Sequence, residues 1–269
     1  MKNSIKKIVF FLTGNKLSQK ILEKTVFVCE YFMGIGSGSG VDNSGEKTVF
    51  EILKKLTHEH FVIFDVGANQ GQFLKIALEN TRNLKRTIYS FEPSKRTFEM
   101  LQQNNRDAKD VYLNNFAFGK ENGTFPLYYD DYGSGLASLT KRDLDFLSID
   151  IKFVEEVTVR VVDDFCNEHD IDRINLLKID VEGHELDVLT GSIEKFNANQ
   201  IDMVLFEFGG CNIDTKTYFH DFFNFFKLYN FALFRITPSG YLYEIKQYSE
   251  ELEKFRTTNF LAISKGSVE

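Results

Sequence analysis

Residues 61–72 read Phe-Val-Ile-Phe-Asp-Val-Gly-Ala-Asn-Gln-Gly-Gln, an apolar run that ends in a turn with two glycines. Short apolar runs rich in β-branched and aromatic residues are typical of strands that are buried on both faces of a parallel sheet. Gly67 and Gly71 let the backbone turn tightly and approach a ligand closely, which a Cβ atom would block. The segment therefore predicts a core strand, a ligand-binding turn and a helix that begins at Gln72.

Strands and helices alternate along the rest of the chain. Further core strands are predicted at 87–92, 111–116, 175–180 and 202–207, with helices at 72–78, 94–104 and 182–196. An inserted β-pair is predicted at 124–129 and 156–162, and further strands at 231–236, 241–245 and 259–264. This alternation indicates an α/β fold with a mostly parallel, doubly wound sheet and an antiparallel C-terminal edge.

The sequence before residue 61 predicts an N-terminal helical extension. Helix-like spacing of apolar residues runs from Ile5 to about Met33, and a glycine- and serine-rich segment follows, from Gly34 to Glu46, before a short helix at 46–56. We expect residues 1–60 to form this extension and residues 61–269 to form the main domain. The glycine- and serine-rich segment is either a cover over a bound ligand or an ordinary linker.

Charge and cysteine content bound the class of protein. The chain has 269 residues and a formal net charge of -7, which repels nucleic acid, so no nucleic-acid partner is expected. Its three cysteines lack metal-ligand spacing and are expected to be buried free thiols in a reducing cytosol. No apolar stretch approaches the roughly 20 residues of a spanning helix. We expect a cytoplasmic protein, compatible with a homo-oligomer and with peripheral membrane contact through its first helix.

Polar and aromatic residues follow the ends of three predicted strands. Ligands bind at the carboxyl ends of strands in an open α/β sheet. Asp65 lies at the end of the first strand and Glu92 at the end of the second. A carboxylate at position 92 can accept hydrogen bonds from both hydroxyls of a ribose. Asn115 and Phe116, near the end of the third strand, offer an amide and an aromatic face to an adenine. The pattern predicts a nucleoside-bearing cofactor.

NAD and S-adenosylmethionine compete for this arrangement. A dinucleotide favours the spacing G-x-G-x-x-G, whereas this turn has G-x-x-x-G and follows Asp65. Asp65 would repel a pyrophosphate and attract the ammonium and sulfonium groups of S-adenosylmethionine. S-adenosylmethionine is therefore the predicted cofactor. A nicotinamide-dependent Rossmann oxidoreductase and a non-catalytic nucleotide-binding scaffold stay open as alternatives.

Several segments resemble the FkbM family of methyltransferases, namely 64–71, 90–93, 115–119 and 177–185, together with 34–38 and 44–46. The resemblance covers about residues 34–265, and Asp-Val-Glu-Gly-His-Glu at 180–185 is its most specific part. It implies a class I Rossmann-like methyltransferase fold and S-adenosylmethionine as the methyl donor. It also implies O-methylation of a sugar, a glycan or a secondary metabolite.

These patterns assign a cofactor site, an acceptor site and catalytic residues. The residues expected at the cofactor are Asp65, Gly67, Ala68, Asn69, Gly71, Glu92, Pro93, Asn115, Phe116 and Asp180. Those expected at the acceptor, a small molecule or glycan, are Glu207, Gly135 and Ser138.

The candidate catalytic residues His184, Asp180 and Glu182 crowd the end of the fourth strand. Histidine is the residue type whose ordinary pKa suits a general base best, so His184 is the candidate base that removes the acceptor's proton. Asp180 could instead anchor the acceptor or the donor's ammonium. Glu182 and Glu185 could instead have a structural role, because carboxylates in the first turn of a helix interact favourably with the helix dipole. No metal is expected, because Phe208 and Gly209 after Glu207 cannot complete an oxygen-ligand set.

Overall fold

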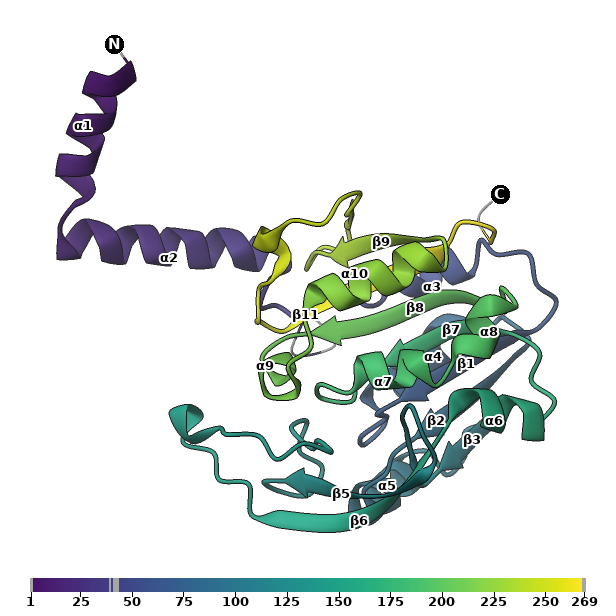
Figure 1. The fold of residues 1–269 in the computed structure, drawn as a ribbon. Helices are drawn as coiled ribbons and strands as arrows, with labels where there is room; N and C mark the ends of the chain where they lie inside the picture. Colours follow the sequence, from purple (N-terminus) through teal and green to yellow (C-terminus); the bar gives the residue numbers. More distant parts are fainter. Residues whose placement is uncertain (1, 39, 41–43, 268–269) are drawn as a thin grey trace.

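The computed structural model describes residues 2–38, 40 and 44–267, and an eight-stranded sheet runs through its body in the order β10-β9-β11-β8-β7-β1-β2-β3. The parallel strands are β1 (Phe61–Val66), β2 (Arg86–Phe91), β3 (Val111–Asn114), β7 (Ile174–Ile179) and β8 (Ile201–Phe208). The antiparallel edge consists of β9 (Phe231–Ile236), β10 (Leu242–Glu244) and β11 (Thr258–Ser264). The predicted α/β fold with an antiparallel C-terminal edge is confirmed (Figure 1).

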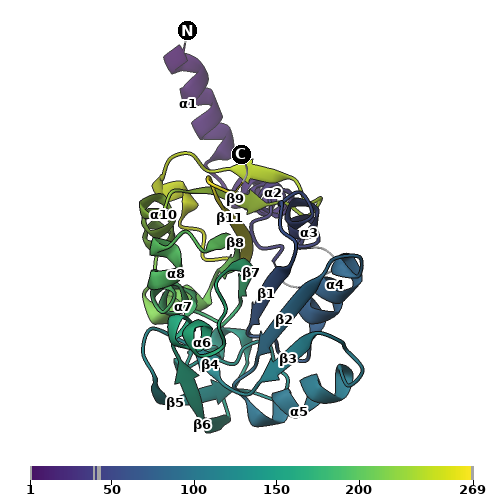
Figure 2. The same cartoon turned by 90° about the vertical axis from the view of Figure 1, so that its right-hand side faces the viewer.

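Helices cover both faces of this sheet (Figure 2). The helices on one face are α3 (Thr48–Leu53), α4 (Gln72–Thr81) and α5 (Lys95–Asn104). Those on the other are α6 (Val162–Glu168), α7 (Glu185–Thr190), α8 (Ile193–Asn197) and α10 (Phe219–Leu228). Successive strand residues point to opposite faces. Leu176 accordingly packs with the first group of helices, and Leu177 with the second. The sheet is therefore doubly wound, as predicted.

A second, three-stranded sheet has the order β4-β6-β5, formed by β4 (Ala117–Phe118), β5 (Gly123–Tyr129) and β6 (Phe153–Arg160). The antiparallel pair β5–β6 confirms the predicted insertion. Two predicted bounds were wrong. The third core strand was predicted to end at residue 116 but ends at Asn114. The next two-residue strand, β4, pairs with β6 in the second sheet. Helix α6 begins at Val162, where the second inserted strand was predicted to continue.

The predicted helix at 182–196 was wrong, since the chain forms α7 and α8 there. Glu182 and Gly183 have φ values of 52° and 104°, which a right-handed helix excludes. Residues 180–184 form a turn instead, and α7 begins at Glu185. The elements that the sequence did not predict include α6, β4, the short helix α9 (Cys211–Thr215) and the 3₁₀ helices η1 (Asp145–Leu147) and η2 (Glu250–Leu252).

The N-terminal extension is two helices, α1 (Lys2–Thr13) and α2 (Lys16–Phe32), where one was predicted. The chain breaks because the side chain of Asn15 accepts a hydrogen bond from the Ser18 N–H and caps α2. Both helices project from the body (Figure 1). None of the helices in the described part of the chain is long and apolar enough to cross a membrane. Cys29 is exposed on α2, which corrects the prediction that the cysteines are buried, whereas Cys166 and Cys211 are buried.

The segment that links this extension to β1 belongs partly to the main core. Val49, Phe50 and Leu53 of α3 are fully buried against α4 and the sheet. The predicted division at residue 60 stays a prediction. Of the glycine- and serine-rich segment, residues 39 and 41–43 lie outside the described residues.

Candidate active site

Two cavities meet at the carboxyl ends of the parallel strands, where open α/β sheets bind ligands. The narrow cavity has a volume of about 80 Å³, and the wide cavity about 930 Å³. The residues that line both are Gly67, Asn69, Ser134, Gly135, Asp180 and Glu182. The turn after β1 and the turn after β7 therefore form the wall between the two cavities.

The turn after β1 lies close to another part of the chain, the turn after β7, at Gly67. Gly67 has a φ of 79°, and a Cβ atom there would lie 1.8 Å from the backbone oxygen of Asp180. Gly71, with a φ of 95°, begins α4 and lines neither cavity. Gly67 thus allows the turns after β1 and β7 to touch, whereas Gly71 serves the start of the helix.

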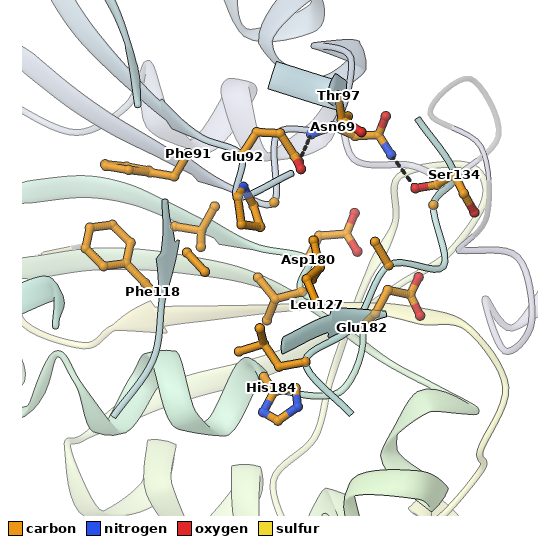
Figure 3. Close-up of a pocket in the computed structure, with 18 residues that line it drawn as sticks. Asn69, Phe91, Glu92, Thr97, Phe118, Leu127, Ser134, Asp180, Glu182 and His184 are labelled. Carbon is orange, nitrogen blue, oxygen red and sulfur yellow. Dashed lines mark hydrogen bonds between the residues drawn. The ribbon is translucent and has the colours of Figure 1, made fainter. Parts of the chain in front are cut away.

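Glu92 joins the turn after β1 to the exit of β2. Its Oε2 accepts a hydrogen bond from the Asn69 N–H, and its Oε1 accepts one from the Ser94 N–H, both at 3.0 Å. The side chain lines the narrow cavity (Figure 3). Burial raises the pKa of Glu92 to about 7, against these two hydrogen bonds, which lower it. A bound hydroxyl would therefore meet a carboxyl group that titrates near neutrality.

Asp65 lies beneath the turn and lines neither cavity, contrary to the prediction of a direct cofactor contact. It is fully buried, and its Oδ1 lies 3.3 Å from Nζ of Lys178. The Lys178 Nζ also lies 3.2 Å from Oδ2 of Asp180 and donates to the Gly67 oxygen. Burial lowers the pKa of Lys178, but Asp180 and Asp65 outweigh it and raise that pKa above its ordinary value. Lys178 therefore separates the charge of Asp65 from the cavities.

Asn115 and Phe116 also lie outside both cavities. The Asn115 side chain donates to the backbone oxygens of Glu92 and Pro93, and so braces the exit of β2. Phe116 packs against Phe91 and Phe118. The apolar wall of the narrow cavity includes residues that the prediction missed, among them Phe118, Leu127, Ala137 and Leu139. Of these, only Phe118 lies inside a segment that resembled the family.

His184 lines the narrow cavity, and both of its ring nitrogens have partners. Nδ1 lies 2.8 Å from Oδ2 of Asp187, and Nε2 lies 3.0 Å from the Thr140 hydroxyl. Figure 3 shows the ring turned away from the carboxylates of Asp180 and Glu182. A carboxylate on Nδ1 fixes the orientation and tautomer of the imidazole.

Three carboxylates, those of Asp180, Glu182 and Glu207, meet at the wide cavity with oxygens within 4.8 Å of one another. Asp180 pairs with Lys178, and Glu182 pairs with Arg142 at 2.7 Å. Glu207 has no side-chain hydrogen bond or ion pair among the residues that the structure describes. Oxygens at this spacing could hold a divalent cation. Without one, the three groups share an acidic cavity that two basic side chains partly neutralise.

Burial makes these acids weaker than ordinary carboxylic acids. Burial and the neighbouring Asp180 raise the pKa of Glu182 to about 8, although Arg142 lowers it. The pKa of Glu207 is raised well above its ordinary value by burial, then by Asp180 and Glu182. Burial likewise raises the pKa of Glu46 to about 7. Near neutral pH the cavity therefore contains carboxyl groups that can hold or release a proton.

The predicted site residues divide into two groups. Those that line a cavity are Gly67, Ala68, Asn69, Glu92, Pro93, Gly135, Asp180, Glu182, His184 and Glu207. Those that do not are Asp65, Gly71, Asn115, Phe116 and Ser138. Ser138 is buried and donates to the backbone oxygen of Glu182, so it supports the turn after β7. Gly38, Gly40 and Glu46, from the predicted cover or linker, line the wide cavity.

Curated proteins with similar sequences are methyltransferases. The hexuronic acid methyltransferase AglP of Haloferax volcanii is 29% identical over 160 residues, covering 56% of this chain and 57% of that protein. The 2-O-methyltransferase NoeI of Sinorhizobium fredii is 26% identical over 155 residues, covering 54% of this chain and 62% of that protein. The chain thus spans less than two thirds of the length of these relatives.

A solved structure shares the fold. The crystal structure of methyltransferase FkbM from Methylobacillus flagellatus KT superposes with a TM-score of 0.50 at 14% identity, covering 86% of this chain and 50% of that chain. This likeness concerns the fold, and it confirms the predicted methyltransferase fold. A family model for the methyltransferase FkbM domain matches residues 65–233, which include the turns after β1, β2, β7 and β8. The chain belongs to the FkbM methyltransferase family.

Proposed function

We propose that the protein transfers a methyl group from S-adenosylmethionine to a hydroxyl of a sugar, glycan or secondary metabolite. The observation that carries the proposal is the pair of joined cavities, one narrow with apolar walls and Glu92, the other wide and acidic. The printed names of two relatives, a hexuronic acid methyltransferase and a 2-O-methyltransferase, support sugar as the acceptor class. Family membership argues against the oxidoreductase and the scaffold.

The narrow cavity fits the nucleoside of the donor. Glu92 would accept hydrogen bonds from the ribose hydroxyls, and Phe118 and Leu139 would contact the adenine. At about 80 Å³ the cavity is smaller than an adenosine, so its side chains must move when the donor binds. Gly67 keeps the wall to the wide cavity free of a Cβ atom. Bound there, S-adenosylmethionine would supply an electrophilic methyl group on a sulfonium centre.

The acceptor's hydroxyl proton needs a base during transfer, and the site offers two candidates. His184, the base predicted from sequence, lines the narrow cavity with both nitrogens engaged. Glu207 lines the wide cavity, where the acceptor would bind, and its carboxylate is unpaired among the described residues. This geometry favours Glu207 as the base and His184 as a residue that positions the turn after β7.

We further propose that transfer needs no divalent metal. Lys178 and Arg142 already neutralise two of the three carboxylates, Asp180 and Glu182, that a cation would use. The protein would then polarise the acceptor with its own hydrogen bonds. Turnover in EDTA at the rate measured with Mg²⁺ is the expected result, and a loss in EDTA that Mg²⁺ restores would contradict it.

Ligand binding and methyl transfer test the proposal in sequence. Calorimetry should detect binding of S-adenosylhomocysteine, the demethylated product of the donor, and should detect no binding of NADH. The chain should then label hydroxylated sugars and glycans with tritium from methyl-labelled S-adenosylmethionine, and the label should be stable to mild alkali, as an ether is and an ester is not. Binding of NADH without S-adenosylhomocysteine would reject the donor. An alkali-labile product would reject the hydroxyl and indicate a carboxylate acceptor.

A further inference from the structure

The body of the protein leaves the apolar face of α2 uncovered. Its apolar side chains are between 43% and 70% exposed, and they are Leu17, Ile21, Leu22, Val26, Val28 and Phe32. At 100° per residue these positions occupy one half of the helix circumference. Exposed apolar side chains continue on α1, where Phe10 and Phe11 are 68% and 86% exposed. An apolar surface of this extent on a projecting element marks a site of interaction.

Among the residues that the structure describes, the ion pairs between α2 and the body lie at the C-terminal end of the helix. Glu30 pairs with Lys254 at 3.2 Å and with Arg256 at 2.8 Å. The Arg256 guanidinium also lies 4.3 Å from the centre of the Phe27 ring. Glu30 and Phe27 lie on the other half of the helix. The opposite, apolar half is therefore held away from the protein in a defined direction.

The extension has the opposite charge to the rest of the chain. Six lysines and two glutamates give residues 1–33 a formal charge of +4, which leaves -11 for the remainder of a chain whose total is -7. Lys16, Lys20 and Lys24 recur every fourth residue, so they form a stripe along α2 beside the apolar half. All three are exposed, and none has an ion pair in the described part of the chain.

A third apolar element points the same way. Phe146 and Leu147 of η1 are 78% and 54% exposed, and both line the wide cavity. Figure 1 shows η1, the short teal helix at the left, projecting on the same side of the molecule as α2. The rim of the wide cavity therefore also carries exposed apolar side chains on this side of the molecule.

The charge and the shape of the extension indicate what binds the apolar half of α2. Helices with an apolar half and lysines on the polar half lie in the headgroup region of anionic bilayers. A second copy of the chain is less suitable, because two-fold pairing of the apolar faces would bring the two lysine stripes together. We propose that α1 and α2 lie on a membrane surface that carries anionic lipid headgroups, with the rim of the wide cavity turned towards it. This docking does not depend on the reaction proposed above.

Vesicle binding by the full chain tests this surface. Sedimentation with phosphatidylcholine vesicles should recover the protein only when they contain phosphatidylglycerol, and high salt should release it. The triple variant K16Q/K20Q/K24Q should reduce the vesicle partition coefficient by about 100-fold, at about fivefold per lysine. Ile21→Gln should reduce it by about tenfold, because it removes buried apolar surface. The matched control is Leu228→Gln, which changes a leucine that is 75% exposed on α10, and it should bind as wild type.

Two results would overturn the proposal. The first is equal recovery with neutral and anionic vesicles, or equal binding by wild type and the triple variant. The second is a dimer in light scattering that Ile21→Gln dissociates, since a second copy would then cover the apolar face. All variants change exposed side chains, so unchanged thermal unfolding is expected and shows that any loss of binding comes from the surface itself.

Discussion

At the scale of single residues, Glu92 combines a structural role with a place in the wall of the narrow cavity. Its two oxygens accept hydrogen bonds from the Asn69 and Ser94 N–H groups, so it fixes the turn after β1 against the exit of β2. The same carboxylate faces the narrow cavity. Because its pKa is raised to about 7, the fraction that is ionised changes across the neutral range.

Glu92→Gln should weaken S-adenosylhomocysteine binding by about 10- to 100-fold, the scale of hydrogen bonds to a charged group. In wild type the affinity should rise as pH increases through about 7, since an ionised Glu92 accepts stronger hydrogen bonds from hydroxyl groups than its protonated form does. The variant should lack this rise. Calorimetry over a pH series measures both, with Glu99→Gln, a surface carboxylate on α5, as the control. Equal affinities for wild type and Glu92→Gln would place the ribose elsewhere.

Glu207→Gln should reduce kcat by about 10²- to 10⁴-fold with little change in donor affinity, since it removes the proposed base. Wild-type kcat should rise with pH through the raised pKa of Glu207, because a base acts only when deprotonated. His184→Asn should retain most of the turnover and keep this limb of the pH profile. A large loss in His184→Asn with Glu207→Gln unaffected would assign the proton transfer to the imidazole.

The sequence predicted which residues lie near the cavities better than it predicted which groups their side chains contact. Glu92, Gly67 and Asp180 line the cavities because each follows directly from the end of a strand, which the sequence indicates. Asp65 differs because a charged residue inside the apolar strand β7, Lys178, reaches it through the core. A lysine in an otherwise apolar strand signals a buried acidic partner, although not which one.

At the scale of elements, Arg142 holds the loop between β5 and β6 against the two turns beside the wide cavity. Its guanidinium lies 2.7 Å from Oε2 of Glu182 and 3.2 Å from Oδ2 of Asp214 on α9. A planar fork can satisfy two carboxylates at once, which a lysine ammonium cannot do with the same geometry. Arg142 therefore fixes the part of the loop that leads into η1, while Ser138 and Thr140 fix the part before it.

Arg142→Lys should raise the KM for the acceptor by about tenfold, the order of one charge-assisted hydrogen bond, and leave S-adenosylhomocysteine binding unchanged. The reason is that the loop and Glu182 border the wide cavity, while the donor's nucleoside would lie in the narrow one. Steady-state kinetics with both substrates varied measures the effect. Arg96→Lys, which alters an exposed pair on α5, is the control. A change confined to donor affinity would contradict the division of the two cavities.

Most of the longer strands and helices were predictable from the sequence, whereas turns and most of the very short elements were not, and the seven-residue helix α6 was missed. The strands at 61–66 and 231–236 match their predictions because apolar runs bounded by turn residues mark them. The two-residue β4 is too short to show periodicity. The helix predicted from residue 182 fails because Glu182 adopts a left-handed conformation, for which a glutamate gives no signal.

At the scale of the whole molecule, the extension has a net positive formal charge and the body a net negative one. The wide cavity of the body contains three carboxyl groups with raised pKa values, those of Glu46, Glu182 and Glu207. A carboxyl group whose pKa is raised in the folded state adds stability below its unfolded pKa and loses it as pH rises through the folded value. For Glu46 and Glu182 this window runs from 4.5 to about 7 and from 4.5 to about 8.

The free energy of unfolding of the ligand-free protein should therefore fall as pH increases from about 5 to about 8. Glu182→Gln should flatten this dependence, since the amide does not titrate. Urea unfolding at a series of pH values measures it, with Glu99→Gln as an exposed control. Stability that rises over the same interval in wild type would mean that the cavity carboxyls ionise normally.

If the proposed reaction holds, the wall shared by the two cavities predicts a kinetic order. Gly67, Asn69 and Asp180 line both cavities, so an acceptor bound in the wide cavity would cover the side of the narrow cavity that these residues form. We therefore expect the donor to bind first and its product to leave last, in a sequential, ordered mechanism. S-adenosylhomocysteine should inhibit competitively against the donor and non-competitively against the acceptor. A random mechanism, with each product competing only against its own substrate, would require a separate entrance to the narrow cavity.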